Sequence, residues 1–156
     1  MAFSKKIAES IETYLKEQDY SYDYDAFHGT FAVEAELSCT LHSCLVVLQV
    51  TEDAFISYAA LYAEVPALRL AYVGEYLHRA NYGLPNGNFE LDYDDGSIHY
   101  KTFLDCPSEV PTARQLDEAF AVPLSVIDRY GDGLMKILGE ELSLPGSIIK
   151  ELDGQR

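Results

Sequence analysis

The sequence is poor in basic residues, contains no tryptophan and lacks a long apolar run. Lys and Arg number 11 against 26 Asp and Glu in 156 residues, which gives a formal net charge of -15. A surface with this charge repels nucleic-acid phosphates and anionic lipid headgroups, so we expect neither a nucleic-acid partner nor a membrane partner. The longest apolar run, residues 44–50, has the length of a strand and is far shorter than a bilayer-spanning helix.

Cysteine is scarce as well, with three residues at Cys39, Cys44 and Cys106. An odd number in a chain of this size is typical of reduced thiols and does not suit a disulfide framework. The first residues mix charges at helical spacing and contain no apolar signal-peptide core. We therefore expect a cytoplasmic protein without a secretion signal.

The remaining composition is that of an ordinary globular domain. Hydrophobic residues make up 48% of the chain and charged residues 24%, which is enough apolar material for one compact core. We expect a single domain over residues 1–142. Residues 143–156, which include Pro145 and Gly146, are expected to form a loose C-terminal tail.

Periodicity predicts a helix followed by three strands in the N-terminal half. Apolar residues recur at helical spacing over residues 4–18, and Ser4 can cap this helix. Residues 19–28 alternate tyrosine with acid, and this pattern fits either a short edge strand or an extended segment. Alternating or β-branched apolar residues predict strands over residues 30–38, 41–50 and 54–62.

The C-terminal half contains a second helix, a hairpin and a third helical region. The second helix begins near Pro66 and ends at Asn81, and the hairpin covers residues 87–104. The third helical region begins near Pro111. Because proline lacks an N–H group, we expect this region to be interrupted or kinked at Pro123.

The hairpin sequence predicts a register. Asp95 and Gly96 suit a two-residue turn, and this turn places apolar residues opposite apolar residues and acids opposite bases. A slip of one residue would spoil every pair. The predicted pairs are Tyr93 with Ile98, Leu91 with Tyr100, Phe89 with Thr102, Asp92 with His99, and Glu90 with Lys101.

The order of elements is therefore α-β-β-β-α-β-β-α, with hairpin-length links between the strands. This order indicates an α+β fold, in which helices flank an antiparallel sheet of about five strands. Parallel βαβ winding does not fit.

Motifs that bind metals or carry catalysis are lacking. Cys39, His42 and Cys44 lie close together in sequence, but no second ligand pair completes a zinc site. The acids before Gly96 do not keep the spacing of a calcium loop, and no nucleophile or phosphate-binding motif is present. We predict no catalytic residue, no metal and no cofactor.

Large apolar and aromatic residues exceed what a single core needs, both on the middle strands and around the second helix. Three helices do not obviously cover both faces of a five-stranded sheet, so part of this surface is available for a homodimer or a client peptide. The candidate surface consists of Tyr58, Tyr62, Leu68, Tyr72 and Tyr76.

The stretch over residues 72–102 resembles the YbjN-like family, described as putative bacterial sensory transduction regulators. The resemblance implies the fold of type III secretion chaperones, which often dimerise and bind extended segments of other proteins. It brings no catalytic residues or cofactor. Five of the motif residues, Arg79, Asn81, Gly87, Phe89 and Gly96, are interpreted as structural. The matching residues are Tyr76, Leu77, Arg79, Ala80, Asn81, Gly87, Asn88, Phe89, Glu90, Leu91, Asp95, Gly96, Tyr100, Lys101 and Thr102.

Our leading hypothesis is a non-catalytic, homodimeric, chaperone-like or regulatory domain that binds a protein or peptide client. Two alternatives stay open. One is a small-molecule-binding protein or hydrolytic enzyme with a site near Arg79, Asn81 and His99. The other is an acidic mimic of nucleic acid, with carboxylates spaced along one face.

Overall fold

The computed structural model describes residues 2–107, 110–139 and 144–154. It confirms the α+β class, with one antiparallel sheet of six strands in the order β1-β2-β3-β4-β6-β5. The elements follow one another as α1 (Lys5–Glu17), β1 (Asp23–Asp25), β2 (Thr30–Glu36), β3 (Ser43–Val50), β4 (Ala54–Leu61), η1 (Ala67–Arg69), α2 (Leu70–Asn81), β5 (Asn88–Leu91), β6 (Ile98–Asp105), α3 (Ala113–Leu138) and α4 (Pro145–Asp153).

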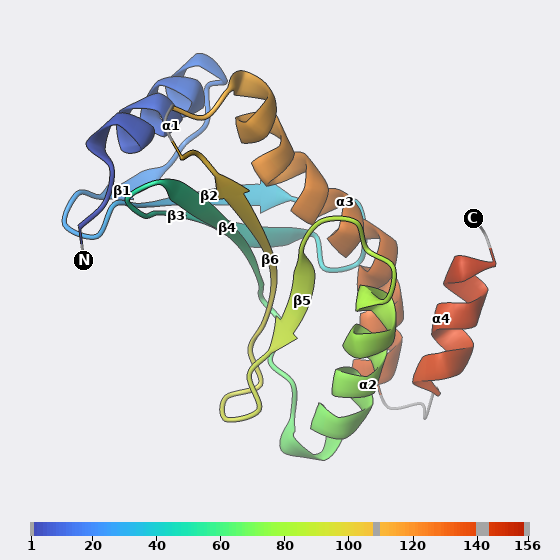
Figure 1. Ribbon diagram of the computed structural model, residues 1–156. Helices are drawn as coiled ribbons and strands as arrows, with labels where there is room; N and C mark the ends of the chain where they lie inside the picture. The colour runs from blue at the N-terminus through green and yellow to red at the C-terminus, as the bar shows by residue number, and fades with distance from the viewer. Residues whose placement is uncertain (1, 108–109, 140–143, 155–156) are drawn as a thin grey trace.

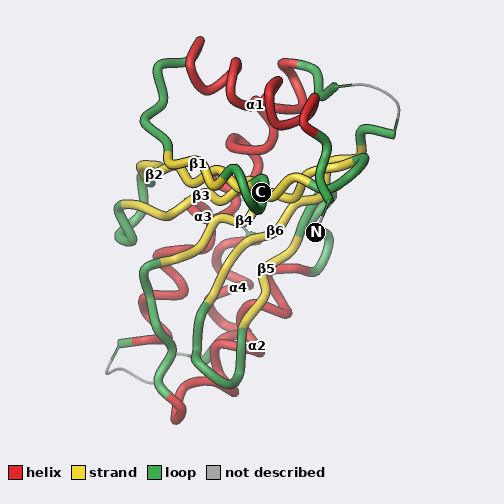
Figure 2. The backbone as a smooth tube through the Cα atoms, turned by 90° about the vertical axis from the view of Figure 1, so that its left-hand side faces the viewer, coloured by secondary structure: helices red, strands yellow, loops and turns green. Residues whose placement is uncertain are grey.

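The helices gather on one side of a strongly twisted sheet. Helix α1 covers the β1–β3 end, and α2 lies beside β5 (Figure 1). Helix α3 links the two groups, since it contacts β4, β6, α1 and α2. In the view turned by 90°, the sheet is in front and the helices lie above, below and behind it (Figure 2). Among the described residues, no helix covers the opposite face of the sheet.

A single hydrophobic core fills the space between the sheet and the helices. Every second residue of β2, β3, β4 and β6 is buried in it, as the alternating pattern predicts. Helix α1 begins as expected, because the Ser4 hydroxyl accepts a hydrogen bond from the Ile7 N–H at 3.3 Å. Its apolar stripe, Ile7, Ile11 and Leu15, lies in the core.

Pro123 does not interrupt α3, which runs continuously from Ala113 to Leu138, so the expectation of an interruption there is wrong. The main-chain oxygen that Pro123 leaves without an intrahelical donor is that of Ala119. The buried hydroxyl of Ser57 on β4 donates to this oxygen at 2.7 Å. A hydrogen bond from the sheet thus replaces the one that the proline removes.

The hairpin forms, but its register differs from the predicted one by two residues. Leu91 lies opposite Ile98, and Phe89 lies opposite Tyr100. The loop is longer than two residues, because the Asp92 N–H donates to the Ser97 oxygen at 2.9 Å and residues 93–96 lie between them. A shift of two residues keeps every side chain on its predicted face, since strand side chains alternate with a period of two.

Hydrogen bonds within the loop and to Val65 hold the hairpin loop, and the register predicted from cross-strand pairs did not include them. The side chain of Asp92 accepts from the Asp94 N–H, and that of Asp95 accepts from the Ser97 N–H, each at 2.8 Å. The Gly96 oxygen also accepts from the Val65 N–H at 3.0 Å. These contacts stabilise the longer loop.

Two further segments, residues 23–25 and 145–153, form regular elements. Residues 23–25 form the short edge strand β1, which settles the ambiguity over residues 19–28 and brings the sheet to six strands. The expectation of a loose C-terminal tail is wrong for residues 145–153. They form α4, which contacts α2 and α3 and contributes Ile148 and Ile149 to the core.

Candidate protein-binding surface

The uncovered side of the sheet carries a continuous apolar patch. We call this side the open face, and its apolar part the stripe. The stripe crosses four strands, and most of its side chains are half-buried, whereas Phe103 is 59% exposed. Its members are Ala32, Leu45, Val47, Ile56, Tyr58, Ala60 and Phe103.

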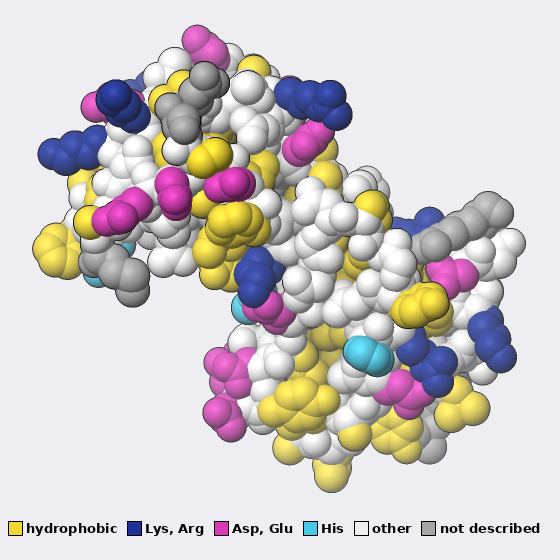
Figure 3. Space-filling view, viewed as in Figure 1, with side chains coloured by type: hydrophobic (Ala, Val, Ile, Leu, Met, Phe, Trp, Pro, Cys, Tyr) yellow, Lys and Arg dark blue, Asp and Glu magenta, His cyan; other side chains and the backbone are white. Residues whose placement is uncertain are grey.

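Strand register brings these residues together. Val47 lies opposite Tyr58 between β3 and β4, and Ile56 lies opposite Phe103 between β4 and β6. Directly opposed side chains on one face of an antiparallel pair lie within contact distance. The molecule is hollowed on the left in Figure 3, on the side of the sheet away from the helices, and hydrophobic side chains gather there.

Carboxylates border the stripe on the β1–β2 side. Asp23, Asp25, Glu34 and Glu36 are all exposed, and their positions in the strands place them on the open face. The Tyr62 hydroxyl donates to Glu34 at 2.5 Å, and this hydrogen bond is the main reason that the pKa of Tyr62 lies above its ordinary value. This border is therefore strongly negative.

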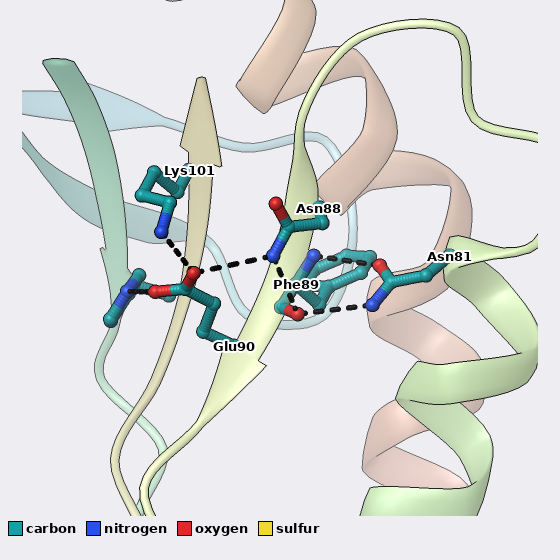
Figure 4. A network of polar contacts seen from close by, with 6 residues as sticks. Asn81, Asn88, Phe89, Glu90 and Lys101 are labelled. Atoms are coloured by element: carbon teal, nitrogen blue, oxygen red, sulfur yellow. Dashed lines mark hydrogen bonds and ion pairs between the residues drawn. The ribbon is translucent and has the colours of Figure 1, made fainter. Parts of the chain in front are cut away.

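A mixed polar network borders the stripe on the β5–β6 side (Figure 4). Glu90 accepts from Lys101 and contacts His99 Nε2 at 2.7 Å. Asn88 donates to the Glu90 carboxylate at 3.4 Å. Burial alone would raise the Glu90 pKa, but the hydrogen bonds from these neighbours bring it below its ordinary value. The Tyr58 ring lies edge-on to His99, with 5.2 Å between the ring centroids, so the network touches the stripe.

The β5 edge of the sheet is closed by a side chain. Asn81, at the end of α2, donates from Nδ2 to the Phe89 oxygen at 3.0 Å and accepts at Oδ1 from the Phe89 N–H at 2.7 Å. These are the hydrogen bonds that a neighbouring strand would make (Figure 4). The other edge, β1, has three residues, all exposed, two of which are aspartates. Short, charged edges discourage the addition of another strand.

The predicted binding residues do not form one surface. Tyr58 and Tyr62 lie on the open face, whereas Leu68 and Tyr72 lie on η1 and α2 in the helical layer. Leu68 is 92% exposed and Tyr72 is 39% exposed. Tyr76 is wrong as a surface residue, because it is fully buried and its hydroxyl donates to the Tyr130 oxygen at 2.6 Å. The apolar periodicity of α2 does not by itself show that Tyr76 is buried and Tyr72 is exposed.

The remaining motif residues have structural contacts in the described part of the chain. Arg79 pairs with Glu75 at 2.8 Å on the exposed side of α2, and Phe89 is in the core. Gly87 and Gly96 have φ angles of 80° and 77°, and each packs against main chain, at Lys101 and Val65 respectively. A side chain at either glycine would be both strained and obstructed.

The hypothetical enzyme site does not assemble. Asn81 faces the β5 main chain, Arg79 pairs with Glu75 on α2, and His99 lies on the open face with Glu90. The pocket that Asn81 lines also contains Gly74, Leu77, His78, Phe89, Leu91 and Tyr93, but neither Arg79 nor His99. Within the described ranges, no three His, Cys, Asp or Glu side chains converge to hold a metal ion.

Six residues of the stripe were missed from sequence: Ala32, Leu45, Val47, Ile56, Ala60 and Phe103. Strands 41–50 and 54–62 were expected to carry more apolar residues than one core needs, but only Tyr58 and Tyr62 were named from them. The same apolar pattern on both faces of a strand could also have pointed to Leu45, Val47 and Ile56.

Comparisons with known proteins agree with this fold. Residues 8–135 match the model of the YbjN family, described as "Putative bacterial sensory transduction regulator". The chain belongs to the YbjN family. No curated protein matches it. A crystal structure described as "YbjN, a putative transcription regulator from E. coli" superposes with a TM-score of 0.60 at 9% identity, over 85% of this chain and 96% of that one.

The similarity to the E. coli structure therefore supports the fold of this chain. It covers almost all of that protein, at an identity too low to transfer its role. In the parts of the chain that the structure describes, no helix is both long enough and apolar enough to cross a lipid bilayer.

Proposed function

We propose that this YbjN-family domain is a non-catalytic regulatory module that binds another protein through the open face. The observation that carries the proposal is the apolar stripe, which no helix of the described residues covers, on a sheet whose other face is covered by helices (Figure 2). Exposed contiguous apolar patches with polar borders are typical of interaction sites. The family description as a sensory transduction regulator supports a role of this kind.

The sheet edges support binding to the face. Asn81 occupies the hydrogen-bonding groups of Phe89 on β5, and β1 presents three exposed residues with two carboxylates. A partner that added a strand would meet one of these two edges. A partner that packs its side chains against the stripe contacts neither edge.

Site-specific photo-crosslinking in the native cells tests the proposal. A benzoylphenylalanine at Phe103 probes the open face, and the same residue at Leu68 is the matched control, because both positions are exposed and Leu68 lies on η1. We expect a discrete protein adduct from position 103 only. An adduct of twice the chain mass would identify a second copy as the partner on this face.

Two results would contradict the proposal. Absence of a discrete adduct from position 103 would argue that nothing docks on the open face. A discrete adduct from position 68 alone would place the binding surface on η1 and α2, with Leu68 and Tyr72.

A further inference from the structure

We propose that the open face binds a cationic amphipathic helix of about ten residues in its partner. This inference rests on the proposed function and adds the chemistry of the partner segment.

The stripe has the length of a short helix. It runs from Ala32 on β2, across β3 and β4, to Phe103 on β6. Neighbouring strands lie about 4.8 Å apart, so the stripe crosses about 14 Å of sheet. A helix of about ten residues is about 15 Å long. Its apolar side chains at i, i+3, i+4 and i+7 can therefore cover the stripe.

The charges around the stripe favour a basic partner. Four exposed carboxylates line the β1–β2 border, whereas the only basic side chains that the strands place on this face, within the described residues, are Lys101 and His99. Both of those contact Glu90. A second copy would bring its own net charge of -15 to the interface. Electrostatic complementarity therefore favours a segment rich in Lys and Arg over self-association.

A helix suits the open face better than an extended segment. An extended chain laid across the face cannot use the main-chain groups of the sheet, so its own N–H and C=O groups would be left unpaired as they are covered. A helix satisfies these groups internally. On the other face of the sheet, the chain's own helices α1 and α3 pack against the strands in this way (Figure 1).

The test uses the full chain and a fluorescein-labelled peptide of about 14 residues, with leucines on one helical face and lysines on the other. One control peptide has the same composition with the leucines scrambled around the helix, and a second has glutamate in place of lysine. Fluorescence anisotropy measures the dissociation constants, and light scattering measures the mass of the complex. We expect one-to-one binding to the lysine amphipathic peptide, at least about tenfold tighter than to either control, and weaker in high salt.

Protein variants locate the binding. Phe103→Ala removes apolar surface from the stripe, and Leu68→Ala is its control on η1. We expect Phe103→Ala to weaken binding about fivefold or more, with no change for Leu68→Ala. The double reversal of Glu34 and Glu36 to Lys should weaken binding about tenfold, whereas the same change at Glu9 and Glu17, exposed on α1, should have little effect.

The outcomes separate this inference from the proposed function. Equal binding of the lysine and scrambled peptides, or equal effects of the two double reversals, would overturn the inference. A dimer in light scattering that Phe103→Ala dissociates would also overturn it, because the occupant would then be a second copy. If position 103 crosslinks to another protein but the lysine peptide does not bind, the proposed function stands and the cationic helix is wrong.

Discussion

The hydroxyl of Ser57 on β4 donates a 2.7 Å hydrogen bond to the main-chain oxygen of Ala119 on α3. Both residues are fully buried. Residue 123 would normally donate to this oxygen within the helix, but Pro123 has no N–H. The proline and the buried serine are therefore complementary, and their pairing joins the longest helix to the centre of the sheet.

Ser57→Ala should lower the free energy of unfolding by about 1–3 kcal/mol, because it leaves the buried Ala119 oxygen without a donor. Pro123→Ala restores an N–H that can donate to the same oxygen. Ser57→Ala should therefore cost clearly less in the Pro123→Ala background, as urea denaturation of the four proteins would measure. Equal costs in the two backgrounds would show that the serine and the proline act independently.

Asn81→Ala should destabilise the hairpin by about 1–3 kcal/mol, because the Phe89 N–H loses its acceptor. The Phe89 oxygen keeps a donor, since Asn88 Nδ2 lies 3.2 Å from it. Asn81→Asp retains an acceptor and loses only the donor, so its stability should lie between those of the wild type and Asn81→Ala.

Amide hydrogen exchange at Phe89 reports this contact directly. The Phe89 N–H should exchange faster in Asn81→Ala and remain protected in Asn81→Asp. Unchanged protection in both variants would mean that Asn81 does not close the β5 edge.

Tyr72 and Tyr76 lie one helical turn apart on α2, and their substitutions should differ sharply. Tyr76→Ala removes a fully buried ring and its hydrogen bond to the Tyr130 oxygen, so we expect a loss of about 3–5 kcal/mol. Tyr72→Ala should change stability by no more than about 0.5 kcal/mol, because Tyr72 is exposed. Comparable losses in urea denaturation would contradict the assignment of Tyr76 to the core.

Asp132 on α3 should make stability depend on acid pH. Its carboxylate accepts from the Thr40 N–H at 2.8 Å and from the Thr40 hydroxyl at 2.7 Å. These two bonds, the N–H first, lower the Asp132 pKa below its ordinary value of 3.8. Because the folded pKa is depressed, its stabilisation is present above the unfolded pKa and is lost as the pH falls through the folded value.

Asp132→Asn provides the comparison, since its side chain does not titrate. The wild type should be more stable than this variant at about pH 7, and the difference should shrink below about pH 4. Urea denaturation at a series of pH values would measure it. A difference that stays constant down to about pH 3 would rule out the ionised Asp132 as the cause.

Much of the fold could be predicted from residue patterns. Alternation identified β2, apolar and β-branched runs identified β3 and β4, and helical spacing identified α1 with its Ser4 cap. These patterns are local, because one face of each element must meet the core. The hairpin shows the limit of this argument: alternation selects the face of Phe89 but cannot distinguish registers that differ by two residues.

The candidate site was less predictable. Its aromatic members Tyr58 and Tyr62 were identified from the surplus of large side chains, but Phe103 was not. A strand pattern states which residues share a face and does not state whether a helix covers that face. The position of α2 beside β5 removes Tyr76 from the surface and leaves the stripe uncovered.

By itself, the sequence determined the class of the fold, the faces of its strands and its negative charge, because these depend on residues near one another or on composition. Only the tertiary structure decided which sheet face stays open, how Ser57 compensates Pro123, how Asn81 closes an edge, and that residues 145–153 join the core. Each of these depends on contacts between segments far apart in sequence, whose energies appear only once the chain has packed.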